Sequence, residues 1–569
     1  MLQRTWILKP EPDNKDVCLL QKELGVHETI CKLLAQRRIN SLEKAKRFFR
    51  PNKQNIHDPM VMKNMSEAIG RIKKAIDKKE KILIYGDYDV DGTTAVAMVF
   101  SFFKSFYTHL SYYVPDRYTE GYGISFKSID FAFENDVKLI IALDCGIKAI
   151  DKVDYAKLRG IDYIICDHHL PGKNIPDGII LNPKQVDCKY PFKELSGAGV
   201  GYKLLQAFCE KNNIGIEKAN IYLDLLAISI GADMVPIVEE NRVLAQYGME
   251  KLNTSPTLGV KAILKNAKIE RKVNMRDIGF SIGPRINAAG RVSHASKAVE
   301  LLLTPCEISA NNGSNEVSIN NSVRKVLDEK TTKEALAILL SDDKHQKKKS
   351  TFVYSDCWHK GVLGIVCNRI QESYYRPTIV LTKNGDIYTG SARSVHGYDL
   401  YEAINSCSNI LESFGGHAFA AGLTIQSKNI KEFEQRFENI VQNTISEKQL
   451  KPTIEIDTEL PLNNIQNGFF KLLNQFEPFG VGNEQPIFKC KNVKAVKGSV
   501  RIVGQKHIKM DLVEENKPKV LISSIAFNQI NHLKNLLNEN SFDICYSLEI
   551  NDWKGKKTLQ AVIKDMSFK

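Results

Sequence analysis

The sequence lacks three features that would each assign the protein to a particular class. None of its 12 cysteines forms a C-x-x-C pair, which argues against a cysteine-ligated zinc site and favours a reducing compartment. No uninterrupted apolar stretch reaches about 18 residues, so we expect no membrane span. Residues 1–16 have no apolar core followed by a small-residue cleavage site, so we expect no secretory signal and a cytoplasmic location.

Composition and length describe a multidomain protein with an excess of positive charge. The chain has 569 residues, of which 43% are hydrophobic and 25% are charged, as is typical of globular proteins. That length exceeds what one ordinary core organises, so we expect three or four domains. The formal net charge of +13 favours an anionic partner, nucleic acid first, although charge alone is weak evidence.

Four short apolar segments indicate a parallel β-sheet. Strands are predicted at residues 81–85, 138–143, 162–166 and 178–182, with helix-length segments between them. Strands that are apolar throughout are typical of a parallel sheet covered by helices on both faces. Ligands of such sheets bind outside the carboxyl ends of the strands.

Groups that can bind metal follow these strands directly. Carboxylate and imidazole ligands suit Mn²⁺ or Mg²⁺, with zinc and iron as alternatives. Without cations, carboxylates this close would repel one another or hold protons. Two divalent ions about 3.5–4 Å apart can clamp a phosphodiester and activate a water molecule. The candidate groups are Asp87, Asp89, Asp91, Asp144, Asp167, His168, His169 and Asp233.

Each of these groups also has a simpler structural interpretation. An aspartate after a strand is more often a helix cap or a solvated turn residue, and Asp91 stands just before a predicted helix. Asp144 could cap a loop, Asp233 could cap the turn before Pro236, and paired histidines are often surface or core residues. Their joint occurrence at strand and helix ends of one fold favours the metal site.

The chain divides into five segments at breaks in this pattern. Residues 1–80 are predicted to be mainly helical and to pack on the catalytic α/β domain, residues 81–305. Residues 306–341 carry no strand signal and predict one long connecting helix. Residues 342–447 predict a second α/β domain. Residues 448–569 predict a small β-barrel with its lead-in.

Four motifs around the candidate ligands resemble those of the DHH phosphoesterase superfamily. They are GDYDVDGTTA, ALDCGI, CDHH and ISIGADMVP, in that order along the chain. Further segments resemble the bacterial RecJ single-strand-specific 5′→3′ DNA exonucleases, from about residue 35 to the end. These segments are VPDRYTEGYG, IGPRINAAGR, WHKGVLGIV, GSARS, FGGHAFAAG, PFGVGNEQP and VGQKHIKMDL.

The resemblance implies both an architecture and an activity. The fold would be α/β, with a DHH parallel-sheet catalytic domain joined by a long helix to a DHH-associated α/β domain that binds nucleic acid. An oligonucleotide-binding (OB) β-barrel would follow. The activity would be metal-dependent degradation of single-stranded DNA from the 5′ end to 5′-mononucleotides, in DNA recombination and repair.

The resemblance also implies a distribution of metal ligands. Asp87 would serve one ion and Asp89 the other, with Asp144 bridging them. His168 and Asp233 would complete the second site. The cofactor would be one or two Mn²⁺ or Mg²⁺ ions.

Three further positions follow from the same motifs. His169 would position the phosphate or stabilise charge, so that Asp89, Asp144 and His169 form the expected catalytic set. Asp91 and Asp167 would orient ligands or cap helices. Other DHH phosphatases carry a histidine four residues before their first aspartate, where this chain has a leucine, Leu83. The first metal site is therefore expected to be poor in ligands.

The 5′ phosphate of the DNA is expected to bind Arg117, Ser391 and Arg393, again by resemblance. The guanidinium group is planar and matches phosphate with two hydrogen bonds, and small neighbouring residues let backbone N–H groups approach. Arg117 could instead be a surface residue paired with Asp116 or Glu120, and the Gly-rich turn GSARS could be an ordinary tight turn.

Three more residues are candidate DNA contacts. His417 lies in a segment that resembles the nucleic-acid-facing loop of the DHH-associated domain. Arg285 and Arg291 flank INAAG and could reach the DNA backbone, or either could form an interdomain salt bridge.

The last 81 residues are strongly basic. They contain 15 Lys or Arg against 8 Asp or Glu, an excess of 7 positive charges, which fits the charged groove of an OB fold. Aromatic residues in such a barrel can stack on bases, although most aromatic residues in short strands belong to the core. The stacking candidates are Phe488, Phe527, Tyr546 and Trp553.

The leading hypothesis is thus a monomeric exonuclease acting on single-stranded DNA. A single-strand-binding protein and a helicase are the expected partners. One alternative is a hydrolase of short oligonucleotides, cyclic dinucleotides or pyrophosphate. Another is a non-catalytic DNA-binding adaptor built on a decayed DHH fold, against which the full set of candidate ligands argues.

Overall fold

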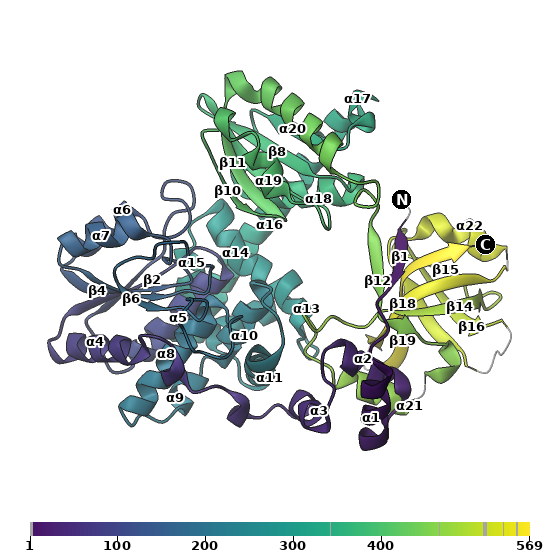
Figure 1. The fold of residues 1–569 in the computed structure, drawn as a ribbon, viewed down its shortest axis with the longest axis horizontal. Helices are drawn as coiled ribbons and strands as arrows, with labels where there is room; N and C mark the ends of the chain where they lie inside the picture. The colour runs from purple at the N-terminus through teal and green to yellow at the C-terminus, as the bar shows by residue number, and fades with distance from the viewer. Residues whose placement is uncertain are drawn as a thin grey trace.

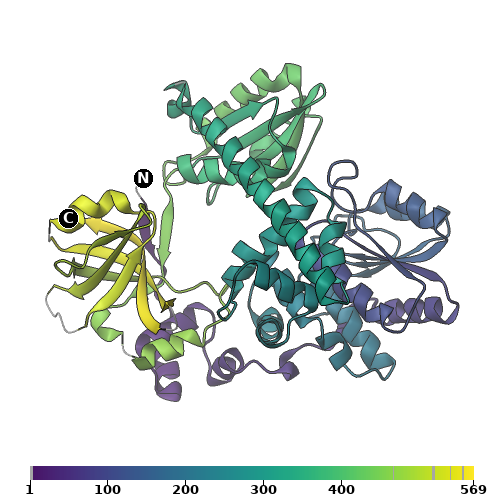
Figure 2. The ribbon, with the colours of Figure 1, turned by 180° about the vertical axis from the view of Figure 1, so that it is seen from behind.

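The computed structural model has three lobes, each built around its own β-sheet (Figure 1). From behind, one long helix runs between the first two lobes (Figure 2). The structure describes residues 4–341, 343–465, 467–515, 520–538, 540–553 and 556–568. None of the helices in these ranges is both long and apolar enough to cross a membrane.

The first lobe contains the predicted parallel sheet, with one strand more than the sequence analysis gave. Its order is β3-β2-β4-β5-β6, and every neighbouring pair is parallel. The half-buried edge strand β3 was missed because Ser111 interrupts its apolar pattern and none of its four residues is fully buried. The strands are β2 (Lys81–Gly86), β3 (Leu110–Tyr113), β4 (Val137–Leu143), β5 (Asp162–Cys166) and β6 (Ile179–Leu181).

Both faces of this sheet are covered by helices. Alternate strand residues such as Ile82 and Ile84 pack with α4 (Met65–Asp77), α5 (Val90–Lys104) and α8 (Gly197–Lys211). The other alternate residues pack on the opposite face, with α6 (Phe126–Glu134) and α7 (Ile150–Leu158). Burial on both faces explains why the strands are apolar throughout.

A helical layer completes the first domain beside α5 and α8. It contains α9 (Glu217–Asn220), α10 (Leu223–Ala232), α11 (Glu239–Thr254), α12 (Leu258–Asn266), α13 (Met275–Asp277), a π-helix (Ile278–Ile282), α14 (Gly283–Val292) and α15 (Ser296–Leu302). The predicted connecting helix is α16 (Glu307–Leu340), and α17 (Asp343–Lys347) follows it.

The second lobe is a mixed sheet in the order β10-β11-β9-β8-β7. The segment GSARS, expected as a Gly-rich turn, belongs instead to strand β9, which pairs on both sides. The predicted loop FGGHAFAAG is likewise a hairpin of β10 and β11. The elements are β7 (Thr351–Ser355), α18 (Leu363–Tyr374), β8 (Thr378–Asn384), β9 (Ile387–Arg393), α19 (Leu400–Asn405), β10 (Ser413–His417), β11 (Ala420–Gln426) and α20 (Ile430–Thr444).

The third lobe is the predicted barrel. Its sheet runs β13-β14-β18-β19-β17-β16-β15, and an additional pairing of β14 with β16 closes it. Two of its strands, β18 and β19, are longer than expected. The elements are β12 (Thr453–Ile456), β13 (Thr458–Glu459), α21 (Asn467–Asn474), β14 (Phe488–Ala495), β15 (Arg501–Val503), β16 (His507–Glu514), β17 (Ile522–Ala526), α22 (Leu533–Leu537), β18 (Phe542–Trp553) and β19 (Lys556–Phe568).

The second part of the N-terminal segment, residues 56–80, packs on the catalytic domain as expected, but the first part does not. Strand β1 (Thr5–Leu8) pairs with β12, the lead-in to the barrel. Helices α1 (Asn14–Leu24) and α2 (Glu28–Gln36) bury their apolar faces in the core of the barrel, and α3 (Leu42–Phe49) packs beside that core. The periodicity of a helix shows which face is apolar but not which domain covers it.

The stacking candidates of the barrel divide into core and surface residues. Phe488 and Tyr546 are fully buried in the barrel core, so neither can stack on a base. Phe527 is 46% exposed and contacts His507 edge to face. The side chain of Trp553 lies outside the described residues.

Candidate metal centre and nucleic-acid interface

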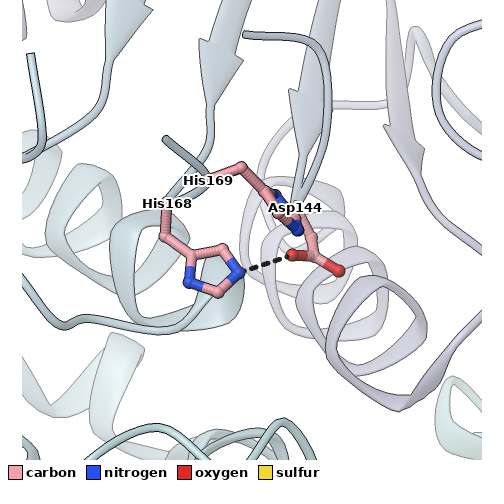
Figure 3. Close-up of side chains that lie close together, drawn as sticks. All are labelled: Asp144, His168 and His169. Carbon is pink, nitrogen blue, oxygen red and sulfur yellow. Dashed lines mark ion pairs between the residues drawn. The ribbon is translucent and has the colours of Figure 1, made fainter. Parts of the chain in front are cut away.

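The predicted ligands converge at the carboxyl ends of β2, β4 and β5. In Figure 3 the side chains of Asp144 and His168 point toward each other, with His169 beside them. The Nε2 atom of His168 lies 3.2 Å from a carboxylate oxygen of Asp144, 3.6 Å from one of Asp233 and 3.9 Å from one of Asp91. Groups from two strand ends, from the first turn of α5 and from the end of α10 therefore share one space.

The backbone around Asp144 is shaped to bring α8 against it. Asp144 has a φ of +61°, a left-handed conformation that is uncommon outside glycine and is often found at functional sites. A Cβ atom at Gly197 would lie 2.5 Å from the Cβ of Asp144. Glycine at position 197 thus lets the first turn of α8 approach the site.

Asp91 is an anchor rather than the helix cap that its position suggested. The N-cap of α5 is Asp89, whose carboxylate accepts a hydrogen bond from the N–H of Gly92. The carboxylate of Asp91 accepts from the N–H groups of Gly197 (2.6 Å) and Ala198 (2.8 Å), and from the hydroxyl of a serine in α10, Ser229. It thereby ties α5 to the N-terminus of α8 and to α10.

Asp167 holds His169 in a fixed orientation. Its carboxylate accepts from the N–H groups of Ile147 and His168, and lies 2.7 Å from the Nδ1 atom of His169. Burial opposes ionisation, but the hydrogen bond and charge of His169 prevail and lower the pKa of Asp167 to about 2. Burial also opposes the charged form of His169, yet its bond to Asp167 raises the pKa of the imidazole.

The opposite shift marks the carboxyl groups that lack such donors. Burial, reinforced by neighbouring carboxylates, raises the pKa of Asp144 and Asp87 well above the usual range. Burial and the charges of Asp91 and Asp89 raise the pKa of Asp233 to about 9. These groups are costly to ionise together unless a cation neutralises them.

Buried ligand atoms without hydrogen-bond partners indicate that the site fits a divalent cation. Asp144 and His168 each bury polar atoms that have no hydrogen-bond partner among the described residues, as does Asp87. Burial lowers the pKa of His168, so its imidazole is neutral and can bind metal. Two sets of side chains bring ligand atoms within 4.8 Å of one another. They are Asp144 with His168 and His169, and Asp91 with His168 and Asp233.

The expected first site is less complete than the second. Neither set includes Asp87 or Asp89, and the carboxylate of Asp87 also accepts from the N–H of Gly123. Leu83 is fully buried in the sheet and offers no ligand atom. Asp91, one of the candidate groups, has a carboxylate oxygen 3.9 Å from the Nε2 atom of His168.

Arg117 is not engaged in the surface ion pair that was its alternative. Its guanidinium lies over the ring of Tyr88, 4.7 Å from the centroid, and has no ion pair among the described residues. The carboxylate of Asp116 accepts from Thr119 and Tyr118, and that of Glu120 accepts from other neighbours. Arg117 is therefore available to an anion.

Ser391 and Arg393 lie on one face of β9 and meet the start of α18. A Cβ atom at Gly364 would lie 3.0 Å from a guanidinium nitrogen of Arg393 and 3.4 Å from the hydroxyl of Ser391.

Arg291 joins this region to the first domain. Its guanidinium donates to the carbonyl of Gly361 (3.0 Å), and its own carbonyl accepts from the hydroxyl of Tyr118. Burial, with the charges of Arg117, Arg324 and Arg393, lowers the pKa of Arg291 to about 10. Guanidinium groups from both domains thus converge where the domains meet.

The remaining DNA candidates are placed as follows. Neither Arg285 nor Arg291 forms an interdomain salt bridge among the described residues, and Arg285 donates to the carbonyl of Ser281. His417 is exposed at the end of β10, and Phe419, two residues later, is 64% exposed.

Two aromatic residues at the site were missed by sequence reasoning. The hydroxyl of Tyr122 lies 3.2 Å from the Nε2 atom of His169, and Tyr88 supports Arg117. The sequence could have pointed to both, because Tyr88 stands between two aspartates of the motif GDYDVDGTTA and Tyr122 stands between two glycines of the motif VPDRYTEGYG.

Comparison with known proteins gives matches over most of the chain. Residues 81–230 match the N-terminal domain of the DHH family, residues 347–443 the DHHA1 domain, and residues 456–565 the RecJ OB domain. The single-stranded-DNA-specific exonuclease RecJ of Bacillus subtilis is 35% identical, over 97% of this chain and 70% of its own. The RecJ of Haemophilus influenzae is 33% identical, over 89% of this chain and 91% of its own.

Solved structures of RecJ proteins also match this chain. RecJ from Thermus thermophilus in complex with Mn²⁺ matches with a TM-score of 0.84 at 24% identity, over 99% of this chain and 80% of that one, which shows the same fold. A second structure, of exonuclease RecJ bound to manganese, matches with a TM-score of 0.60 at 29% identity, over 68% of this chain and 96% of that one.

The metal-free protein should lose stability as the pH rises. The pKa of Asp233 is raised from 3.8 to about 9, so the stability that its protonated form contributes is complete below 3.8 and is lost toward 9. We expect the melting temperature of chelator-treated protein to fall between about pH 6 and about pH 8.5, and saturating Mn²⁺ to remove most of the fall. A melting temperature that stays level without metal would contradict this.

Asp144→Asn should stabilise the metal-free protein and abolish its response to Mn²⁺. The change replaces a carboxyl group whose ionisation is opposed by burial and by its neighbours with a neutral amide, which is worth on the order of 1 kcal/mol at a pH where the carboxyl would ionise, and the amide can donate to His168. Thermal unfolding with chelator and with Mn²⁺ measures both effects. Asp151→Asn is the control, because Asp151 is exposed in the first turn of α7 and should leave the Mn²⁺ response unchanged.

Proposed function

Because this chain belongs to the RecJ family of single-stranded-DNA-specific exonucleases, we propose that it is a metal-dependent exonuclease that removes 5′-mononucleotides from the 5′ end of single-stranded DNA. The observation that carries the chemistry is the set of buried carboxylates and imidazoles with unpartnered ligand atoms at one edge of the sheet. The residues that would hold Mn²⁺ or Mg²⁺ are Asp87, Asp89, Asp144, His168 and Asp233, while Asp91 and Asp167 fix the elements around them.

When bound, such an ion neutralises charge on the scissile phosphate and lowers the pKa of a water molecule. The chain's own residues do the positioning. His169, whose pKa is raised by Asp167 and whose ring is oriented through Nδ1, presents Nε2 to the site and in its protonated form can donate a hydrogen bond to a phosphate oxygen. The hydroxyl of Tyr122 contacts the same nitrogen and helps to fix the ring.

The guanidinium groups at the domain junction support the 5′ polarity. Arg117, Ser391 and Arg393 form a positive region that fits a terminal phosphate dianion better than a single phosphodiester charge. Arg117 also acts electrostatically on Asp87, so the region lies beside the metal ligands. A strand held there by its 5′ end would place a phosphodiester bond near the carboxylates.

Contacts farther along the strand would come from His417 and the exposed Phe419 of the second domain, from Arg285 and Arg291, and from the basic barrel. We propose that the enzyme acts as a monomer in the cytoplasm during recombination and repair. Single strands arise there when a helicase unwinds duplex DNA, and a single-strand-binding protein then covers them.

A time course on DNA labelled at either end tests the proposal. With Mn²⁺, a 5′-labelled single strand should release its label as a mononucleotide at once, whereas a 3′-labelled strand should shorten progressively. Chelator should stop both reactions, and blunt duplex should resist. Early release of the 3′ label, or turnover confined to dinucleotides, would contradict the assignment.

Arg393→Met should weaken the preference for a 5′ phosphate. Loss of a charge-assisted hydrogen bond costs about 1.5–3 kcal/mol, so kcat/KM on a 5′-phosphorylated strand should fall about 10- to 100-fold. The rate on a 5′-hydroxyl strand should change little. Arg436→Met is the matched control, because Arg436 lies in the same domain but pairs with Glu432 on the surface of α20. Equal losses on both strands would argue against a phosphate contact.

A further inference from the structure

The motif PFGVGNEQP, residues 478–486, takes no part in the metal centre or the phosphate region. With the three residues before it, it forms most of the connection between α21 and β14, and we call residues 475–486 the clasp segment. This segment faces α11 of the first domain. It encloses one buried side chain from that helix, Arg242.

Arg242 is held by backbone carbonyls alone. Its side chain is only 4% exposed, and it forms no ion pair among the described residues. The guanidinium also stacks on Phe48, 3.8 Å from the ring centroid. Burial and the charge of Arg37 lower its pKa to about 9. The carbonyls that accept its hydrogen bonds are those of Phe48 (3.1 Å), Gln475 (3.2 Å), Phe476 (2.9 Å), Glu477 (3.0 Å) and Pro478 (3.4 Å).

Hydrogen bonds to the clasp segment direct these carbonyls toward the guanidinium of Arg242. The amide of Asn483 donates to the carbonyls of Phe476 and Pro478, and Arg37 donates to the amide oxygen of Asn483. The N–H of Ile237, in the loop before α11, donates to the carbonyl of Val481 (2.7 Å). A guanidinium with five N–H groups is the one side chain that can satisfy so many acceptors at once.

Beside the clasp, a cavity of about 720 Å³ lies between the first domain and the barrel, with Phe280 on one wall and Leu548 on the other. Among the described residues, the ion pair that crosses this cavity joins Arg276 to Glu549 at 3.9 Å, with both side chains partly or largely exposed. Exposed pairs of this kind contribute little. Apart from the chain that leads from α3 to the first domain, where the carbonyl of Pro51 accepts from the hydroxyl of Tyr247, the clasp is thus the main attachment of the barrel to the first domain.

We infer that Arg242 is a positioning residue that sets the distance between the barrel and the metal centre, and so determines how tightly long strands are held. This inference rests on the proposed function, because it takes the barrel and the metal site to bind one DNA strand. When two surfaces that bind one strand are held at a fixed distance, binding at the first raises the effective concentration of the strand at the second. A loose connection between the surfaces lowers that effective concentration. The affinity for a substrate too short to reach the barrel should therefore not depend on the clasp.

The experiment compares Arg242→Met with the native protein on two substrates. For a 5′-phosphorylated single strand of about 40 nucleotides, which is long enough to span both surfaces, KM should rise about tenfold with kcat unchanged. For a 5′-phosphorylated dinucleotide both constants should stay as they are. Arg376→Met is the matched control, since Arg376 is also buried and also donates to a backbone carbonyl, but within the second domain. It should show no dependence on strand length.

A second readout separates this inference from the proposed function. Binding of the same long strand in chelator, followed by fluorescence anisotropy, should weaken about tenfold in Arg242→Met even if no hydrolysis occurs. Solution X-ray scattering should show a broader distribution of interdomain distances. If Arg242→Met does not fold, Arg242→Lys keeps the charge with fewer donors and should show the same length dependence at smaller amplitude. Native affinity for the long strand in a folded variant, or equal losses on both substrates, would overturn the inference.

Discussion

The site depends on one electrostatic constraint, which is that several carboxyl groups are buried within a few ångströms of one another. Asp87, Asp144 and Asp233 all have raised pKa values, because burial and mutual repulsion disfavour their ionised forms. Such crowding destabilises a protein unless something compensates for it. A divalent cation is the natural counter-charge, and the unpartnered atoms of His168 complete its ligand set.

The rest of the first domain serves to hold these groups in place. A parallel sheet brings the ends of its strands to one edge, so that residues far apart in the sequence meet there. Asp91 and Asp167 have similar carboxylates but a different task, since each is surrounded by hydrogen-bond donors and fixes a neighbouring element. Opposite charge is placed across the junction, where arginines of two domains converge and, among the described residues, Arg117 and Arg393 have no carboxylate partner. In the proposed function, a substrate with a terminal phosphate would bridge the two regions.

The sequence predicts the parts of this arrangement that depend on local pattern. Continuous apolar segments identified four of the five strands of the first sheet, and the long uninterrupted helical pattern identified α16. The sequence did not predict which domain covers the apolar face of each helix. Helices α1 and α2 pack on the barrel rather than on the first domain, because amphipathicity does not specify which surface covers an apolar face. The cap of α5 proved to be Asp89, while Asp91 reaches α8, more than 100 residues away in the sequence. Arg242 gave no signal at all, because its partners are backbone carbonyls placed by another domain.

Proton release on metal binding tests the central claim most directly. Calorimetric titration of metal-free protein with Mn²⁺ at about pH 8, in buffers of different ionisation enthalpy, counts the protons displaced. If crowded carboxyl groups hold protons until a cation replaces them, binding should release about one proton or more per ion, and Asp144→Asn should remove the signal. Tight Mn²⁺ binding with no proton release would show that the carboxylates are already ionised, and would contradict the account.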